Sequence, residues 1–379
     1  MNSASYEKFI PEQTNSAMQD RLHFLDSSRG LAAFVVFLSH FVLVFYPGLN
    51  QTWIASTPLH LLWDGSNAVI YFFIHSGFIL TYRLHQRKFE LTKSSYSAFV
   101  WRRIFRIYPL FLFVLFTMFA LVRLDYFRNN PLGPLSFPLN YYWQGESGFA
   151  DVIRQSLLVL RLPNDPVMRL IPQDWSLSIE MAVSLLLPAF YVFQSRFSYW
   201  LLGFIYITVQ LLGLDRFVFD FVIGIVLVSL YPSFRNWWMS KSSFPAKGLI
   251  LILGIALCGA DHYLPFSFFQ ILEMIFIHTK AIGCALFLLV ILASEKIKKM
   301  LSIRLLVLQG KTSYSIYLVH LLVLFLCFPL ASVQFLSTPA LFIMIYTLVF
   351  LLSIFLYHGI ELPMIRLGRK LESKIFKIS

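Results

Sequence analysis

A succession of long apolar runs dominates this sequence and restricts the chain to a helical fold embedded in a membrane. Ten runs are about as long as a helix needs to cross a bilayer, roughly 17–25 residues. They are residues 27–47, 65–84, 104–122, 174–194, 198–213, 217–232, 248–264, 279–294, 313–332 and 339–358. Charged residues make up 13% of the chain, about half the share of a soluble domain. The sequence therefore predicts an all-α polytopic membrane protein with about ten transmembrane helices.

The positions of the basic residues predict the orientation of these helices. Most of the 31 Lys and Arg residues fall in alternate connecting segments, with a dense group between residues 83 and 106. Cytoplasmic loops carry such an excess, so we expect both termini in the cytoplasm. The net charge of +12 then reflects membrane topology, and no nucleic-acid partner is needed to explain it.

The runs also predict the division of the chain. Residues 1–24 form a polar cytoplasmic segment without a secretory signal peptide, residues 25–363 the transmembrane domain, and residues 364–379 a basic cytoplasmic tail. The segment between Arg123 and Gln173 is the long loop and is expected on the outer side, with a helix over residues 150–162 in the membrane interface.

Three cysteines, Cys258, Cys284 and Cys327, lie within apolar runs. Their spacing matches no metal-binding pattern. We expect buried thiols that behave as small apolar residues. The sequence predicts neither a disulfide framework nor a metal site.

The first apolar run carries three ionisable residues, Asp26, Arg29 and His40. Such groups are costly inside a bilayer and usually functional. Arg29 and His40 are 11 residues apart, so they share one helix face about 16 Å apart along the axis. Asp26 precedes Arg29 by one turn and is expected to pair with it. This run predicts a functional site with His40 as its deeper member, although a packing histidine or a proton path would show the same residues.

Later runs supply further polar candidates. Glu180 is predicted at a depth comparable to His40, where its carboxylate would orient the imidazole as a general base; a partly solvated carboxylate is the alternative. Arg102, Arg103 and Arg106 fit either phosphate contacts or plain cytoplasmic anchors. Glu361 is expected at the cytoplasmic surface.

Six motifs occur in an order that resembles one known family. They are LDSSRGLAA followed by His40, FFIHSGFIL, WRRIFRIYPL, WSLSIE, GKTSYSIYLVH and IELP, spread over residues 25–363. The chain resembles the integral-membrane acyltransferase family 3, bacterial enzymes that O-acylate surface polysaccharides and related acceptors. The resemblance implies a multi-pass protein of the bacterial inner membrane. It also implies acyl-CoA as a cytoplasmic co-substrate, no permanently bound cofactor, and an acceptor hydroxyl presented from the outer side.

The resemblance assigns roles to residues that match the motifs. It implies His40, Glu180 and Arg29 as catalytic, and Arg29, Arg103 and Arg106 as the acyl-CoA contacts. The residues expected to line the substrate cavity are Asp26, His75, Ser76, Trp175, Ser313, Tyr317 and His320. His75 stands where the family usually has an apolar residue, and Val183 with Ser184 replaces an aromatic pair. The acceptor pocket is where we expect this chain to differ.

The predicted function is transfer of an acyl group, expected to be acetyl, from acyl-CoA to a hydroxyl of a cell-surface glycan or its lipid-linked precursor. The expected partners are acyl-CoA, a carbohydrate acceptor and the lipid bilayer. The alternative is a transporter or flippase of a lipid-linked saccharide, with Asp26, Arg29 and His40 forming a substrate or proton path. Many transporters contain inverted repeats with broken helices, and the sequence shows no convincing internal repeat.

Overall fold

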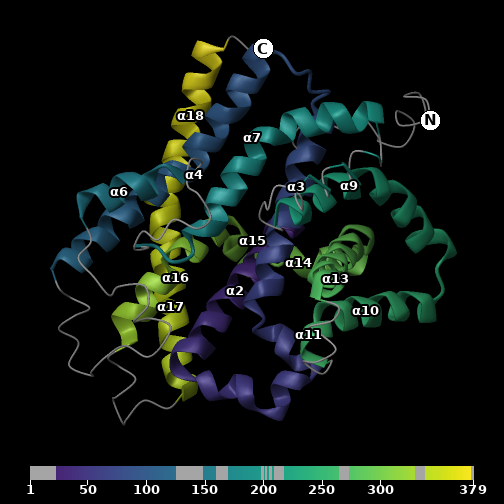
Figure 1. Cartoon of the computed structure of the whole chain (residues 1–379), viewed down its shortest axis with the longest axis horizontal. Helices are drawn as coiled ribbons and strands as arrows, with labels where there is room; N and C mark the ends of the chain where they lie inside the picture. Colours follow the sequence, from purple (N-terminus) through teal and green to yellow (C-terminus); the bar gives the residue numbers. More distant parts are fainter. Residues whose placement is uncertain are drawn as a thin grey trace.

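The computed structural model describes residues 23–124, 148–158, 170–197, 200, 203–204, 207–208, 217–263, 273–328 and 338–376. Within these ranges every regular element is a helix, as Figure 1 shows. The predicted all-α class is therefore confirmed for the described part of the chain. Cys258, Cys284 and Cys327 are buried free thiols.

Apart from α6, which falls in the predicted interfacial helix 150–162, the main helices coincide with predicted apolar runs. They are α2 (His23–Phe45), α3 (Gly65–Gln86), α4 (Lys93–Arg123), α6 (Phe149–Ser156), α7 (Asp174–Phe197), α9 (Phe217–Asn236), α10 (Phe244–Cys258), α13 (Glu273–Ala293), α16 (Ser313–Cys327) and α17 (Thr338–Leu356). The shorter α-helices are α11 (Ala260–Tyr263), α14 (Glu295–Leu301), α15 (Arg304–Lys311) and α18 (Leu362–Ile375). Short 3-10 segments η3 (Pro47–Gln51), η4 (Trp53–Ser56) and η5 (Pro58–Leu62) join α2 to α3, and π-helical turns occur at η7 (Trp237–Lys241) and η9 (Tyr357–Glu361).

Helix length and hydropathy support fewer membrane crossings than the sequence predicts. In the described residues, five helical units qualify by length and apolar composition, or six when α15 and α16, bent by 72° to each other, count as one span. The five are α2, α4, α7, α9 with η7, and α17 with η9 and α18. Helix α10 has 15 residues, and α3 includes Asn67, His75 and Ser76, which lower its hydropathy. The predicted run 198–213 lies mostly outside the described residues, as does most of the predicted outer loop, and the count of ten is not confirmed.

Two glycine contacts set the helix packing around α2 and α3. At Gly310 a Cβ atom would lie 2.3 Å from the carbonyl oxygen of Asp26, so α15 crosses α2 at backbone contact. Gln309 strengthens this crossing by donating to the Gly30 carbonyl at 2.9 Å. At Gly77 a Cβ would lie 2.1 Å from the Phe221 carbonyl oxygen, so α3 and α9 also pack at backbone contact.

Substituting Gly310 tests the α2–α15 crossing. We expect Gly310→Ala to lower the free energy of unfolding by about 3 kcal/mol, because the added methyl meets backbone atoms that have no rotamer to change. Thermal unfolding of the detergent-purified protein measures the effect. Gly248→Ala is the matched control, since nothing lies within 4 Å of its Cβ position. Equal unfolding temperatures for both variants would contradict the crossing.

The C-terminal segment continues the fold as a helix. Helix α18 packs along α4, where the Trp101 indole N–H donates to the Gly368 carbonyl at 3.0 Å. Arg102 of α4 also forms an ion pair with Glu372 of α18. The segment predicted as a basic tail is thus a docked helix through Ile375, and Figure 1 shows it beside α4.

Candidate functional site

His40 of α2 and His320 of α16 form a pair at the centre of the predicted site. Nδ1 of His40 lies 3.3 Å from Nε2 of His320, and the ring centroids are 5.0 Å apart. His320 is fully buried, whereas His40 is partly exposed. The contact between α2 and α16 brings the two histidines together.

Two backbone carbonyls determine which ring nitrogens of this pair carry protons. Nδ1 of His40 lies 2.9 Å from the Val36 carbonyl oxygen, and Nδ1 of His320 lies 2.6 Å from that of Tyr317. A carbonyl only accepts hydrogen bonds, so both Nδ1 atoms must be donors. In the neutral rings both Nε2 atoms are then acceptors. Nε2 of His320 accepts from His40, while Nε2 of His40 keeps its lone pair and bonds to no described residue.

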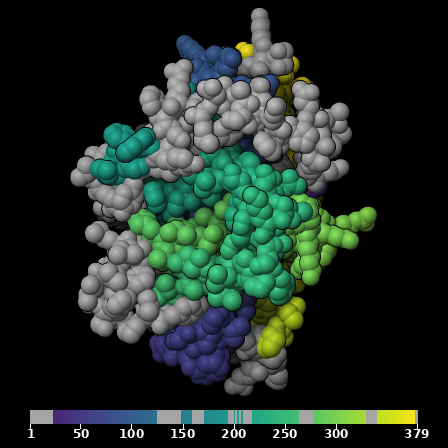
Figure 2. Space-filling view, turned by 90° about the vertical axis from the view of Figure 1, so that its right-hand side faces the viewer, coloured from purple at the N-terminus to yellow at the C-terminus, as the bar shows by residue number. Residues whose placement is uncertain are grey.

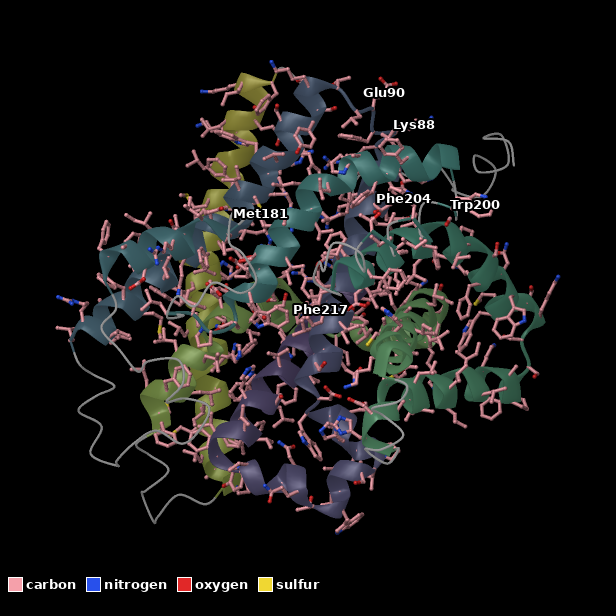
Figure 3. All side chains as sticks on the ribbon, in the orientation of Figure 1. Lys88, Glu90, Met181, Trp200, Phe204 and Phe217 are labelled. Carbon is pink, nitrogen blue, oxygen red and sulfur yellow. The ribbon has the colours of Figure 1, made fainter. Side chains whose placement is uncertain are left out.

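The first turn of α7 docks beside this pair. The Ser176 hydroxyl lies 2.6 Å from the Tyr317 hydroxyl, and Gln173 donates to the Leu318 carbonyl at 2.9 Å. Trp175 packs on Phe217 at the start of α9, with ring centroids 5.0 Å apart. Figure 3 labels Phe217 near the middle of the bundle. The WSLSIE and GKTSYSIYLVH motifs therefore meet here through the Ser176–Tyr317 contact.

Glu180 has a different partner from the predicted one. Its Oε1 lies 2.7 Å from Nη2 of Arg103, and Nε of Arg103 donates to the Ser184 hydroxyl at 3.2 Å. The hydrogen bonds of His40 to described residues go to Val36 and His320 instead. Depth along a helix does not report its rotation, and the rotation of α7 turns Glu180 toward α4. The predicted Glu180–His40 contact is therefore wrong, and the side chain that contacts the His40 imidazole is His320.

The carboxylate of Glu361 was predicted at the cytoplasmic surface, but the residue is buried, with 1% of its surface exposed. It accepts from Nη1 of Arg106 and from the Ser315 hydroxyl, the latter at 2.7 Å. Arg106 also lies over the Tyr314 ring, 5.7 Å from its centroid. The π-helical turn η9 carries Glu361 inward. Its place in the IELP motif, directly after an apolar run, was the sequence signal for this role.

Arg29 lies among these charged groups without a matching hydrogen bond. Its Nε is buried and has no partner among the described residues. It interacts electrostatically with Asp26, Glu180 and Glu361, but the expected direct salt bridge with Asp26 does not form. Arg29 and Arg106 repel each other. This region, which we call the arginine cluster (Arg29, Arg103 and Arg106), therefore retains donors for an anion.

Of the remaining predicted lining residues, His75 and Ser313 are buried and Ser76 is partly exposed. Nε2 of His75 lies 3.1 Å from the Leu25 carbonyl oxygen, so this 2% exposed ring joins α3 to α2 and packs inside the bundle. Ser313 is fully buried, and its hydroxyl has no partner among the described residues.

The comparison with family models finds one match that covers most of the chain. A model described as the acyltransferase domain, Acyl_transf_3, matches residues 22–358, a range that contains the histidine pair and the arginine cluster. No curated protein matches the chain, and no solved structure does. Because the model covers most of the chain, the protein belongs to the acyltransferase 3 family and is a membrane acyltransferase.

Proposed function

We propose that this protein transfers an acetyl group from cytoplasmic acyl-CoA to a hydroxyl of a cell-surface glycan or its lipid-linked precursor, in a bacterial inner membrane. The observation that carries the proposal is the histidine pair. It fixes the His40 ring through Nδ1 while its basic Nε2 stays unbonded to described residues. A positioned base of this kind suits removal of a proton from an alcohol.

In the proposed transfer step, His40 carries one proton from the acceptor hydroxyl to the departing thiolate. Nε2 of His40 accepts the proton of the acceptor hydroxyl as its oxygen attacks the thioester carbonyl. The carbon–sulfur bond breaks, and the departing thiolate takes the proton back from His40. The imidazolium formed in between donates through Nδ1–H to the Val36 carbonyl and to Nε2 of His320. His320 thus holds the base in its working tautomer, as the third member of a catalytic triad does.

The arginine cluster is assigned to the donor. Arg29 precedes His40 by 11 residues of helix, a rise of about 16 Å, which is too far to stabilise an oxyanion formed at His40. The extended pantetheine arm of coenzyme A spans a distance of that order. Of the roles predicted for Arg29, donor binding therefore fits best. Its buried, unpaired Nε supports this role, since guanidinium groups bind phosphate with several donors at once.

Membrane vesicles supplied with labelled acetyl-CoA and a glycan acceptor test the function. We expect release of free CoA thiol and, in equal amount, acetyl ester on the extracted glycan. Vesicles without the protein are the control. Movement of a lipid-linked saccharide across the membrane with no thiol release would contradict the acyltransferase proposal and favour a transporter.

A further inference from the structure

A polar cluster of four potential metal ligands lies where α3 begins, separate from the histidine pair. His60 of η5 and Asp64, the N-cap of α3, meet Asp261 and His262 of α11. We call these four residues the α3–α11 cluster. Figure 1 shows α11 near the start of α3. Figure 2 shows the purple N-terminal segment below the green helices on this face.

Three donor atoms of this cluster, from His60, Asp64 and His262, lie close enough together to share one ion. Nε2 of His262 lies 3.6 Å from Oδ2 of Asp64 and 3.7 Å from Oδ1 of Asp261, and Nδ1 of His60 lies 3.8 Å from the same Asp64 oxygen. The ligand atoms of His60, Asp64 and His262 all lie within 4.8 Å of one another. Four ligands at about 2.0–2.1 Å from a tetrahedral zinc ion are roughly 3.4 Å apart. The observed spacing slightly exceeds that value and is too long for hydrogen bonds.

Two of these atoms are buried and lack hydrogen-bond partners among the described residues. They are Nδ1 of His60 and Oδ1 of Asp261. His60 itself is 8% exposed. Buried polar atoms are normally satisfied, and each exception in a native fold needs an explanation. A cation bound between His60, Asp64 and His262 would satisfy Nδ1 of His60.

We propose that the α3–α11 cluster binds a divalent metal ion of the zinc class through Nδ1 of His60, Oδ2 of Asp64 and Nε2 of His262, with a water molecule as the fourth ligand. Neutral imidazole and carboxylate together are a usual zinc donor set. His60 and Asp64 are four residues apart, but His262 lies about 200 residues further along the chain, so the sequence gave no sign of the site. The ion would tie the η5–α3 junction to α11.

The surroundings of Asp64 orient its carboxylate toward this point. Oδ1 accepts from the Asn67 backbone N–H at 3.0 Å, and Oδ2 accepts from the Asn67 side chain at 2.6 Å. Such outer hydrogen bonds commonly position metal ligands. Lys280 lies 3.2 Å from Oδ2 of Asp64 and 2.6 Å from Oδ2 of Asp261. Its ammonium group competes with a cation for these carboxylates, so Lys280 would set the affinity.

The metal ion would also stabilise the start of α3, which packs against α2 next to His40. Gly65, the residue after Asp64, packs against Ser39 so closely that a Cβ there would lie 2.8 Å from the Ser39 hydroxyl oxygen. Fixing Asp64 therefore fixes the part of α3 that contacts α2 next to His40. Metal binding itself does not depend on the proposed acyl transfer, and a separate readout tests it.

The test uses the full-length protein, purified in detergent with a tag that contains no histidine and stripped with a chelator. Zinc content after dialysis and the visible absorption of bound cobalt report occupancy and coordination. We expect one ion per chain with the spectrum of four-coordinate cobalt. His60→Gln and His262→Gln should each weaken binding by more than about 100-fold, because even outer-shell changes cost about 10–100-fold. His358→Gln, at an exposed residue, should bind as the wild type does.

Two further results decide between a metal site and an ion-pair network alone. Lys280→Met should bind zinc about tenfold more tightly or better, because it removes one opposing charge. His262 is 31% exposed, so His262→Gln is expected to fold, which its elution as a single species checks. The proposal is overturned if wild type holds no more metal than the folded His262→Gln protein, or if zinc leaves the unfolding temperature of Lys280→Met unchanged.

Discussion

Replacing His40 with alanine is expected to lower kcat for acyl transfer by about 100- to 10,000-fold, the range typical of a lost general base. The hydroxyl oxygen of the acceptor is a weak nucleophile, and in this account Nε2 of His40 is what activates it. KM for acetyl-CoA should change little, because the arginine cluster lies about three helical turns away. Initial rates of thiol release and ester formation at matched protein levels measure both parameters.

The control for this prediction is a second histidine substitution. His358 is exposed on η9, so His358→Ala should retain wild-type kcat. Ester formation that is equally fast in His40→Ala and His358→Ala would remove His40 from the mechanism.

Loss of the buried Glu361 carboxylate is expected to destabilise the fold strongly. Glu361→Gln leaves Arg106 without its anionic partner, and breaking a buried ion pair costs about 3–5 kcal/mol. We expect about 3 kcal/mol, because the Arg106 side chain keeps 26% of its surface exposed while that of Glu361 has none. The Ser315 hydroxyl still has an acceptor in glutamine, so the charge is the main change. Thermal unfolding in detergent measures the loss.

Glu295→Gln serves as the matched control for this charge effect. Its carboxylate faces Arg235 at 3.7 Å, with both side chains about half exposed, and such pairs contribute about 1 kcal/mol or less. A Glu361→Gln protein that unfolds at the same temperature as Glu295→Gln would show that the buried pair with Arg106 does not stabilise the fold.

Several features of the site were predictable because they depend on local patterns. The apolar runs located α2, α3, α4, α7 and α16, since each run reflects the helix periodicity and length of its own segment. The motif order identified the family, which the match over residues 22–358 confirms.

Other features depend on how helices rotate and bend, which no single run reports. Glu180 contacts Arg103 because of the rotation of α7, and Glu361 is buried because η9 turns it inward. His320 was predicted to line the cavity, and its contact with His40 required the packing of α16 on α2. The 72° bend between α15 and α16 likewise depends on how the two helices pack, and the predicted run 313–332 gives no sign of it. The α3–α11 cluster joins residues from two distant segments, 60–64 and 261–262, for the same reason.

The central claim is that His40 and His320 act as one catalytic unit in acyl transfer, and a double-mutant cycle tests it most directly. The ester-forming rates of His40→Ala, His320→Ala and the double variant are compared with that of the wild type. Residues that act as a unit are strongly non-additive, so the double variant should be about as slow as His40→Ala alone. If the two losses multiply instead, His320 does not act through His40, and the account of the histidine pair is contradicted.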